Sequence, residues 1–115
     1  MSDILPKLDK IRIPVEKFTE YALNPYKSKK SKDKATAFEL ALGYNLGNYE
    51  LLINSIAANI PYYKAVAKGD NGYGMTYEVI MPLKGDNGKT AKVLTAWIDD
   101  LELDEMRLIN AYVDK

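Results

Sequence analysis

Hydrophobic positions in the first half of the chain recur at helical spacing in three stretches. The first stretch, residues 14–25, lies between two prolines. A second helix is expected from Ser31, with Gly43 as its C-terminal cap. A third is expected between Asn48, a favourable N-cap, and Pro61. The apolar residues that define these helices are Phe18, Tyr21, Ala35, Phe38, Leu42, Tyr49, Leu52, Ile53, Ile56 and Ile60.

After Pro61 the hydrophobic period changes from helical spacing to two, which is typical of strands. Two copies of the tetrapeptide GDNG, at 69–72 and 85–88, separate alternating segments. Asn-Gly pairs in this context are a strong hairpin signal, because both residues tolerate a positive φ. Strands are expected over residues 62–68, 75–83, 90–98 and 106–113.

These elements predict an α+β fold. The N-terminal helices are expected to pack on one face of an antiparallel sheet of about four strands in a meander. Residues 10–14 alternate charged and apolar side chains and suit a short edge strand that ends at a proline. At 115 residues the chain has the size of one domain, so residues 1–115 are expected to form a single domain.

The repeated GDNG tetrapeptide also raises the hypothesis of calcium loops. Calcium sites need six or more oxygen ligands from a longer loop with spaced acidic residues, so two similar turns are the preferred interpretation. There is no Walker A loop, Rossmann glycine fingerprint or nucleophile elbow. Neither a metal nor a cofactor is therefore expected.

The composition narrows the available chemistry. The chain has 47% hydrophobic and 28% charged residues, as soluble globular proteins do, but no cysteine and no histidine. Thiolate chemistry and the usual general base near neutral pH are both excluded. The N-terminus does not resemble a secretory signal, and no apolar run approaches the length of a membrane span. We expect cytoplasmic residence, or export as an effector without a signal peptide of its own, and no membrane partner.

The net charge of zero conceals a patterned distribution. Residues 27–34, KSKKSKDK, contain five lysines, and residues 99–105, DDLELDE, contain five acids. The first part of this run, residues 27–30, is expected to be a solvated loop. Lys32 and Lys34, at a helix entry, are expected either to be solvated as well or to bind a substrate phosphate. The acidic run is expected to be an exposed hairpin loop, with a counter-charge to the lysines as the alternative.

Four residues of the last two strands are further candidates. Thr95 and Trp97 share a face with Val93, so core packing is the first interpretation of Trp97. A buried Thr95 hydroxyl would need a partner. Tyr112 and Asn110 share a face of the final strand. The chain has nine tyrosines against two phenylalanines, which is compatible with a polar surface on which bases stack.

Seven short motifs, taken in order, resemble those of a small uncharacterised bacterial domain family. Members of that family occur at the C-termini of polymorphic toxins and of phage head-morphogenesis proteins, and their organisation resembles the RelE/barnase/EndoU-like ribonuclease fold. The resemblance covers nearly the whole chain. Its motifs are YALNP (21–25), KDKATAF (32–38), ALGY (41–44), YEV (77–79), GDNGKTAKV (85–93), TAWI (95–98) and NAYV (110–113).

The resemblance implies metal-independent RNA cleavage, in which the 2′-hydroxyl attacks its neighbouring phosphate. Lys32 and Lys34 would hold the phosphate, Thr95 would donate a hydrogen bond to it, and Tyr112 would orient the base or the phosphate. The implied binding residues are Asp33, Trp97 and Asn110.

The chain departs from the family pattern at two positions. Asp33 stands where the family has histidine, and Leu94 stands where arginine often precedes the threonine. Two hypotheses follow. One is a ribonuclease-like effector that acts on RNA. The other is a catalytically inactive module that binds a protein partner, such as an immunity protein, in a phage or toxin system.

Overall fold

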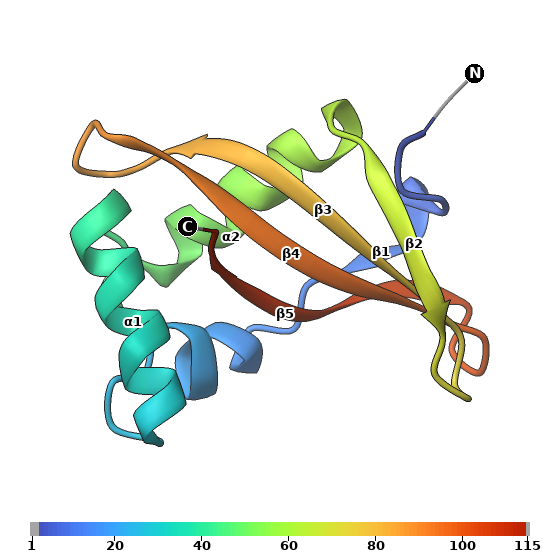
Figure 1. The fold of residues 1–115 in the computed structure, drawn as a ribbon, viewed down its shortest axis with the longest axis horizontal. Helices are drawn as coiled ribbons and strands as arrows, with labels where there is room; N and C mark the ends of the chain where they lie inside the picture. Colours follow the sequence, from blue (N-terminus) through green and yellow to red (C-terminus); the bar gives the residue numbers. More distant parts are fainter. Residues whose placement is uncertain (1–2, 115) are drawn as a thin grey trace.

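The computed structural model describes residues 3–114 and contains one five-stranded mixed sheet (Figure 1). The strand order is β1-β5-β4-β3-β2. Strands β2 to β5 form the antiparallel meander that the sequence predicts, and β1 joins β5 in parallel as the expected short edge strand. The strands are β1 (Ile11–Arg12), β2 (Ala65–Asp70), β3 (Met75–Lys84), β4 (Thr90–Asp100) and β5 (Glu105–Val113). The predicted α+β class is confirmed.

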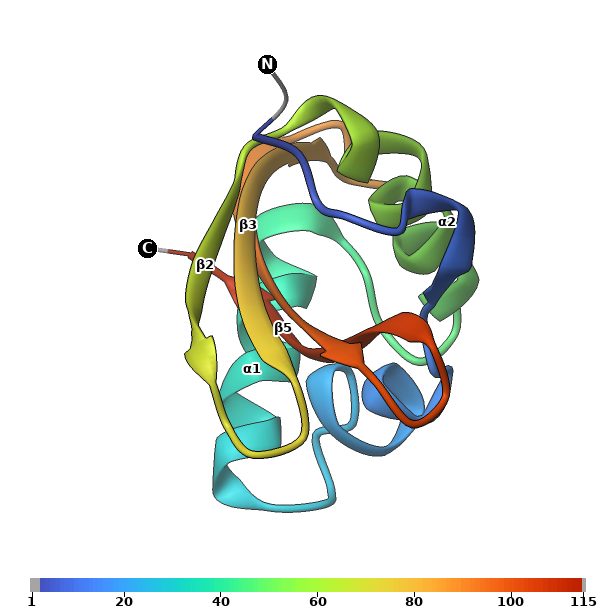
Figure 2. The same ribbon diagram turned by 90° about the vertical axis from the view of Figure 1, so that its right-hand side faces the viewer.

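The helices precede β2 and pack on the sheet. The sheet curves and α2 lies in its hollow (Figure 2), while α1 crosses the end of the sheet near the β3–β4 turn (Figure 1). The first predicted helix is a single π-helical turn. The helical elements are η1 (Leu8–Lys10), η2 (Phe18–Ala22), α1 (Lys29–Leu42), α2 (Tyr49–Asn59) and η3 (Ile60–Tyr62).

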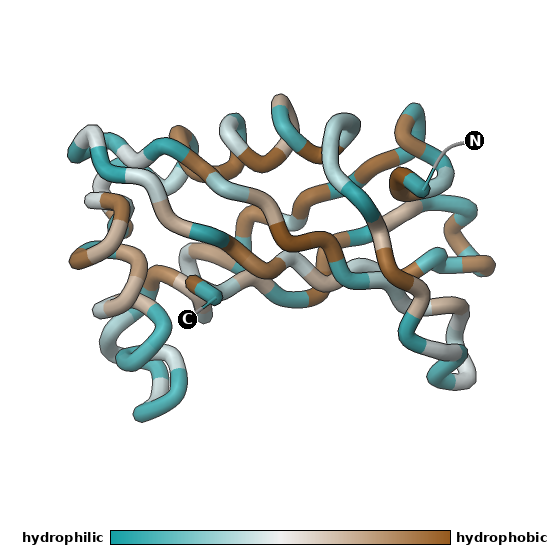
Figure 3. The backbone as a smooth tube through the Cα atoms, turned by 45° about the horizontal axis from the view of Figure 1, so that its top comes forward, coloured by the Kyte–Doolittle hydropathy of each residue, from teal (hydrophilic) through white to brown (hydrophobic). Residues whose placement is uncertain are grey.

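One hydrophobic core joins the helices to the inner face of the sheet. Along β3 the buried positions alternate as the sequence predicts, and in β4 the predicted Val93, Thr95 and Trp97 are fully buried, but Leu94 and Ile98 beside them are buried as well. Figure 3 shows hydrophobic and hydrophilic stretches along the strands, and hydrophilic residues at the start of α1. The core residues include Phe18, Phe38, Leu42, Leu52, Ile56, Val79, Met81, Leu83, Val93, Trp97, Met106, Leu108 and Ala111.

Helix α1 begins at Lys29, before the expected start at Ser31. Ser28 is the N-cap, and its hydroxyl accepts a hydrogen bond from the Ser31 backbone N–H at 3.1 Å. The Ser31 hydroxyl in turn accepts from the Ser28 N–H at 2.9 Å. This reciprocal capping box extends the helix. The assignment of residues 27–30 to a solvated loop was therefore wrong for Lys29 and Lys30, which lie in the first helical turn.

The two GDNG turns have different structural roles. The turn at 85–88 lies against the C-terminal end of α1, where the Asn87 N–H donates to the Leu42 carbonyl. A Cβ on Gly85 would lie only 2.1 Å from the Leu42 carbonyl oxygen. In the other turn, a Cβ on Gly69 or Gly72 would meet nothing within 4 Å. The second turn thus fixes α1 to the sheet, whereas the first is a hairpin turn open to solvent.

The acidic run at 99–105 pairs with the N-terminal segment. Lys7 Nζ lies 2.6 Å from Asp99 and 2.9 Å from Asp104, and Lys10 also pairs with Asp104. Arg12 Nε lies 2.8 Å from Glu105. We call these contacts the terminal clamp. The alternative in which these acids neutralise the lysines of residues 27–34 was wrong. Among residues 3–114, the cations that pair with the acids are the three of the terminal clamp and Arg107.

Gly85→Ala is expected to destabilise the fold, because the new methyl group would overlap backbone atoms of Leu42 that no side-chain movement can clear. Overpacking of this kind costs about 3 kcal/mol, which lowers the melting temperature by roughly 10 °C or more. Thermal unfolding followed by circular dichroism measures it. Gly47→Ala is the matched control, since its nearest neighbour is the Asn45 side chain. Equal melting temperatures for the two variants would contradict the docking of this turn.

Asp104→Asn is expected to reduce the acid sensitivity of the fold. Hydrogen bonds from Lys10 and Lys7 lower the pKa of Asp104 from 3.8 to about 2. A carboxyl with a depressed pKa contributes stability that is present above about pH 4 and is lost as the pH falls towards 2. Urea unfolding at stepped pH should show the wild type more stable than the variant at pH 7, with the difference vanishing near pH 2. Glu102→Gln, in the same turn, is the control. Glu102 forms no ion pair among residues 3–114, so this substitution should not give a stability difference that vanishes near pH 2.

Candidate functional site

Lys34 of α1 reaches the exposed face of β5. Its Nζ donates a hydrogen bond to Asn110 Oδ1 at 2.7 Å and lies 5.7 Å from the centroid of the Tyr112 ring. Both distances lie within the range of direct interaction for a lysine cation. Lys34, Asn110 and Tyr112, all half-buried, therefore form one cluster across the junction of helix and sheet.

A β-bulge in β5 sets the direction of these side chains. Asn110 pairs with Ala96, but the next residue of β4, Trp97, pairs with Leu108, so Ile109 is the extra residue. Leu108 and Ala111 consequently both face the core. Asn110 and Tyr112 face the other side of the sheet, because Tyr112 pairs with Leu94, which lies out of phase with the inward positions of β4.

Lys17 and Tyr21 complete a cleft around Lys34. The cleft has a volume of about 250 Å³ and is lined by Lys17, Tyr21, Lys34, Ile109 and Asn110. The helical pattern of the sequence did not identify Lys17, and it predicted that Tyr21 lies on the same face of the helix as Phe18. The π-helical turn instead buries Phe18 and leaves Tyr21 half exposed. The sequence does contain a sign that Lys17 belongs beside Tyr21. The two residues are four positions apart, and side chains at i and i+4 are neighbours on a helix.

The electrostatics of the cleft favour a bound anion. Burial lowers the pKa of Lys34, and the positive charges of Lys30 and Lys17 lower it further. Among residues 3–114, no carboxylate forms an ion pair with any of these three lysines. A phosphate group in the cleft would supply the missing negative charge.

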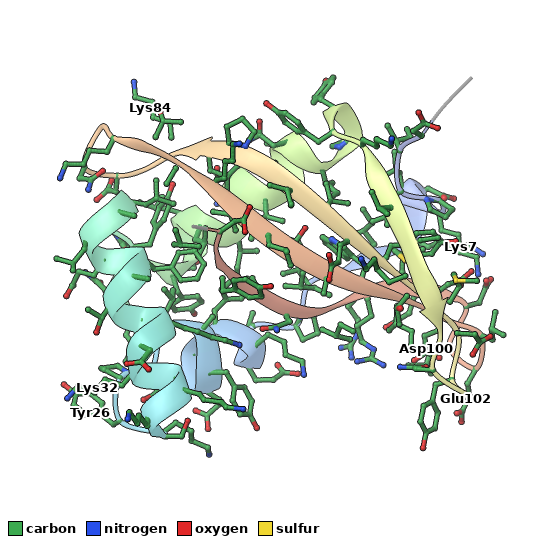
Figure 4. The ribbon with its side chains drawn as sticks, in the orientation of Figure 1. Lys7, Tyr26, Lys32, Lys84, Asp100 and Glu102 are labelled. Atoms are coloured by element: carbon green, nitrogen blue, oxygen red, sulfur yellow. The ribbon has the colours of Figure 1, made fainter. Side chains whose placement is uncertain are left out.

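Lys32 and Asp33 are both exposed on α1 and line no part of this cleft. Positions two apart on a helix point in nearly opposite directions, so Lys32 and Lys34 cannot share a target close to the helix. In Figure 4 Lys32 lies with Tyr26 at the outer side of α1, away from β5.

Thr95 and Trp97 lie in the core. Thr95 is fully buried, and its hydroxyl donates to the Val79 carbonyl at 2.9 Å. The same hydroxyl accepts a hydrogen bond from Trp97 Nε1 at 2.8 Å. Thr95 is thus the partner that a buried indole N–H requires. The core interpretation of Trp97 is correct.

The four residues expected to act together thus occupy three different surroundings. Lys34 and Tyr112 meet at the cleft with Asn110, Lys32 lies in solvent, and Thr95 lies in the core. Within the part of the chain described, no group of three or more acidic side chains could hold a metal ion. No helix in that part is long and apolar enough to cross a membrane.

Comparison with known proteins gives a family and a fold. The model of a family described as a domain of unknown function, DUF6883, matches residues 4–115. No curated protein matches the chain. A chain in the structure of a contact-dependent growth inhibition toxin–immunity protein complex from Klebsiella pneumoniae 342 has a similar fold, with a TM-score of 0.64 at 14% identity. The similarity covers 89% of this chain and 98% of that one.

Thr95→Val is expected to lower the free energy of unfolding by about 1–3 kcal/mol, because it removes the acceptor of the buried Trp97 N–H and leaves that N–H unsatisfied. Chemical denaturation followed by the fluorescence of the single tryptophan measures the loss. Thr95→Ser retains the hydroxyl and should lose only the contribution of a methyl group, about 1 kcal/mol. A valine variant more stable than the serine variant would argue against this role.

Proposed function

The chain belongs to the DUF6883 family, and we propose that it is a toxin-like domain that cleaves RNA without a metal ion. The site is the cleft that Lys17, Lys34 and Asn110 line, together with Tyr112, whose ring lies beside the Lys34 amine. Relative to the sequence hypothesis, the proposal keeps Lys34, Asn110 and Tyr112, adds Lys17, and leaves out Lys32 and Thr95.

One observation carries the proposal: the Lys34 amine is held where it has no anionic partner. Lys30 and Lys17 repel it, burial lowers its pKa, and its hydrogen-bond partner Asn110 is neutral. A partly buried cluster of like charges lowers the stability of the free protein. Its presence is therefore better explained by the binding of an anion than by a contribution to folding. Tyr112 beside the amine offers a ring face on which an unpaired base could stack.

The reaction that suits these groups is transesterification of RNA. The 2′-oxygen attacks the adjacent phosphorus, a new P–O2′ bond forms, and the P–O5′ bond breaks. The 2′-hydroxyl loses its proton to water, and the departing 5′-oxygen takes a proton from water. Lys34 and Lys17 would stabilise the negative charge of the pentacoordinate phosphorane, and Asn110 would hold the Lys34 amine in position. The products are a 2′,3′-cyclic phosphate and a 5′-hydroxyl.

The fold similarity supports a place in a toxin–immunity system. The solved structure of similar fold is a complex of a growth inhibition toxin with its immunity protein. This agrees with a chain that works as an effector and is neutralised by a protein partner. The same similarity is the reason to keep a second candidate function.

The second candidate is a catalytically inactive module that binds a protein partner. It is favoured by the lining of the cleft, which contains no carboxylate and, in a chain without histidine, no imidazole. A general base normally contributes 10²–10⁴-fold to such a reaction. The same positive cleft would accept acidic side chains of a protein.

The test is cleavage of total tRNA by the purified protein in the presence of EDTA. We expect cleavage by the wild type and a loss of at least about 10²-fold in Lys34→Ala, which removes the main stabilising cation. Lys32→Ala is the matched control on the same helix and should cleave as the wild type does. Folded Thr95→Val should also retain activity, because its hydroxyl lies in the core.

Three results would count against this function. Activity that disappears with EDTA would refute the metal-independent reaction. Equal loss in Lys32→Ala and Lys34→Ala would refute the assignment of the cleft. A stable wild-type protein without activity on any RNA would leave the protein-binding module as the function.

A further inference from the structure

Tyr21 lines the cleft, and two lysine amines lie close to its ring. Lys17 Nζ is 5.8 Å and Lys27 Nζ is 5.9 Å from the centroid of its ring. About half of the Tyr21 surface is exposed. Lys27 also lies 3.6 Å from Glu20 in an exposed ion pair, whereas no carboxylate among residues 3–114 pairs with Lys17.

The backbone that carries Tyr21 is fixed. The Leu23 N–H donates to the Phe18 carbonyl at 2.9 Å, which closes the π-helical turn, and Phe18 is fully buried beneath it. The Asn24 side chain donates to the Thr19 carbonyl at 2.9 Å. π-Helical turns are rare and occur frequently at functional sites. Tyr21 is therefore presented to solvent by a rigid support.

Two similar units thus meet at the cleft through their lysines, Lys34 and Lys17. In one, Tyr112 accompanies Lys34, and in the other, Tyr21 accompanies Lys17. Lys17, Tyr21 and Lys34 line one continuous cleft, and the charge of Lys17 is felt at Lys34. A ligand that occupies both units needs at least two negative groups and at least one flat face for stacking. Consecutive nucleotides of an unpaired strand have both.

We propose that Tyr21 and Lys17 form a second nucleotide-binding subsite, which makes the substrate an unpaired RNA segment rather than a duplex. The inference rests on the proposed function. The base of the nucleotide next to the cleavage site stacks on Tyr21, and its phosphate binds Lys17. Lys27 moves aside or joins the contact with the phosphate. A paired base cannot stack on Tyr21, so the subsite selects loops, bulges and single-stranded ends.

The test is fluorescence anisotropy with labelled 2′-O-methyl RNA hexamers, which have no free 2′-hydroxyl and cannot be cleaved. Wild-type protein should bind the single strand and bind the same sequence in a duplex at least about tenfold more weakly. Tyr21→Leu should weaken single-strand binding by roughly tenfold, as loss of a stacked base does. Tyr21→Phe keeps the ring and should restore binding. Lys17→Ala should reduce the slope of log K against log salt by about 1.

The matched controls lie on the other side of α1. Tyr26→Leu and Lys32→Ala remove an exposed tyrosine and an exposed lysine that line no part of this cleft, and both should bind RNA as the wild type does. Circular dichroism of each variant separates lost binding from lost folding, and Tyr21→Phe provides a second, milder change at the same position.

The outcomes separate this inference from the proposed function. If the wild type cleaves RNA but Tyr21→Leu binds RNA as tightly as the Tyr26→Leu control does, the subsite is refuted and the ribonuclease function is retained. Binding through Tyr21 without any cleavage would support the subsite and overturn the ribonuclease. Equal binding of single strand and duplex would overturn the selection of unpaired RNA. Wild-type protein that binds no RNA but binds an acidic peptide would overturn both.

Discussion

The bulge at Ile109 is the constraint on which the site depends. In a regular strand, residues 108 and 111 would face opposite sides of the sheet, and only one of them could enter the core. The extra residue lets Leu108 and Ala111 both pack inward, and it leaves Asn110 and Tyr112 outward opposite Ala96 and Leu94. Bulges often lie next to active sites because they redirect side chains in this way.

The position of Lys34 is set by the packing of α1 rather than by the lysine itself. Phe38 and Leu42 bury the inner face of the helix, and each fully buried side chain of this kind contributes about 2 kcal/mol. The turn at 85–88 holds the C-terminal end of the helix, and the capping box at Ser28 defines its start. Repulsion from the like charges of Lys17 and Lys30 opposes the position of Lys34. The packing, turn and capping contacts of α1 offset this repulsion and keep Lys34 in place.

The fold was largely predictable from the sequence, and the site only in part. Period-two alternation identifies β3 and β4, because every second residue of their central part faces the core, and it also places Asn110 and Tyr112 on one face. The alternation put Thr95 on the face of Val93, and the family resemblance assigned it to the site, because a hydroxyl does not reveal whether its partner is an indole or a ligand. Lys17 was missed although it stands four residues before Tyr21, because hydrophobic periodicity does not single out a charged residue. Pairing Lys32 with Lys34 followed their nearness in sequence and ignored the helical angle between them.

A chain with no net charge can still attract a polyanion, because screening limits electrostatic interactions to about 10 Å. The terminal clamp neutralises Lys7, Lys10 and Arg12 with the acids of residues 99–105, at the end of the sheet opposite α1 (Figure 1). Among residues 3–114, five of the lysines without an ion pair lie just before η2 or along α1: Lys17, Lys29, Lys30, Lys32 and Lys34. A phosphate that approaches the cleft therefore experiences their local field, and the balance of charge over the whole chain has little influence on it.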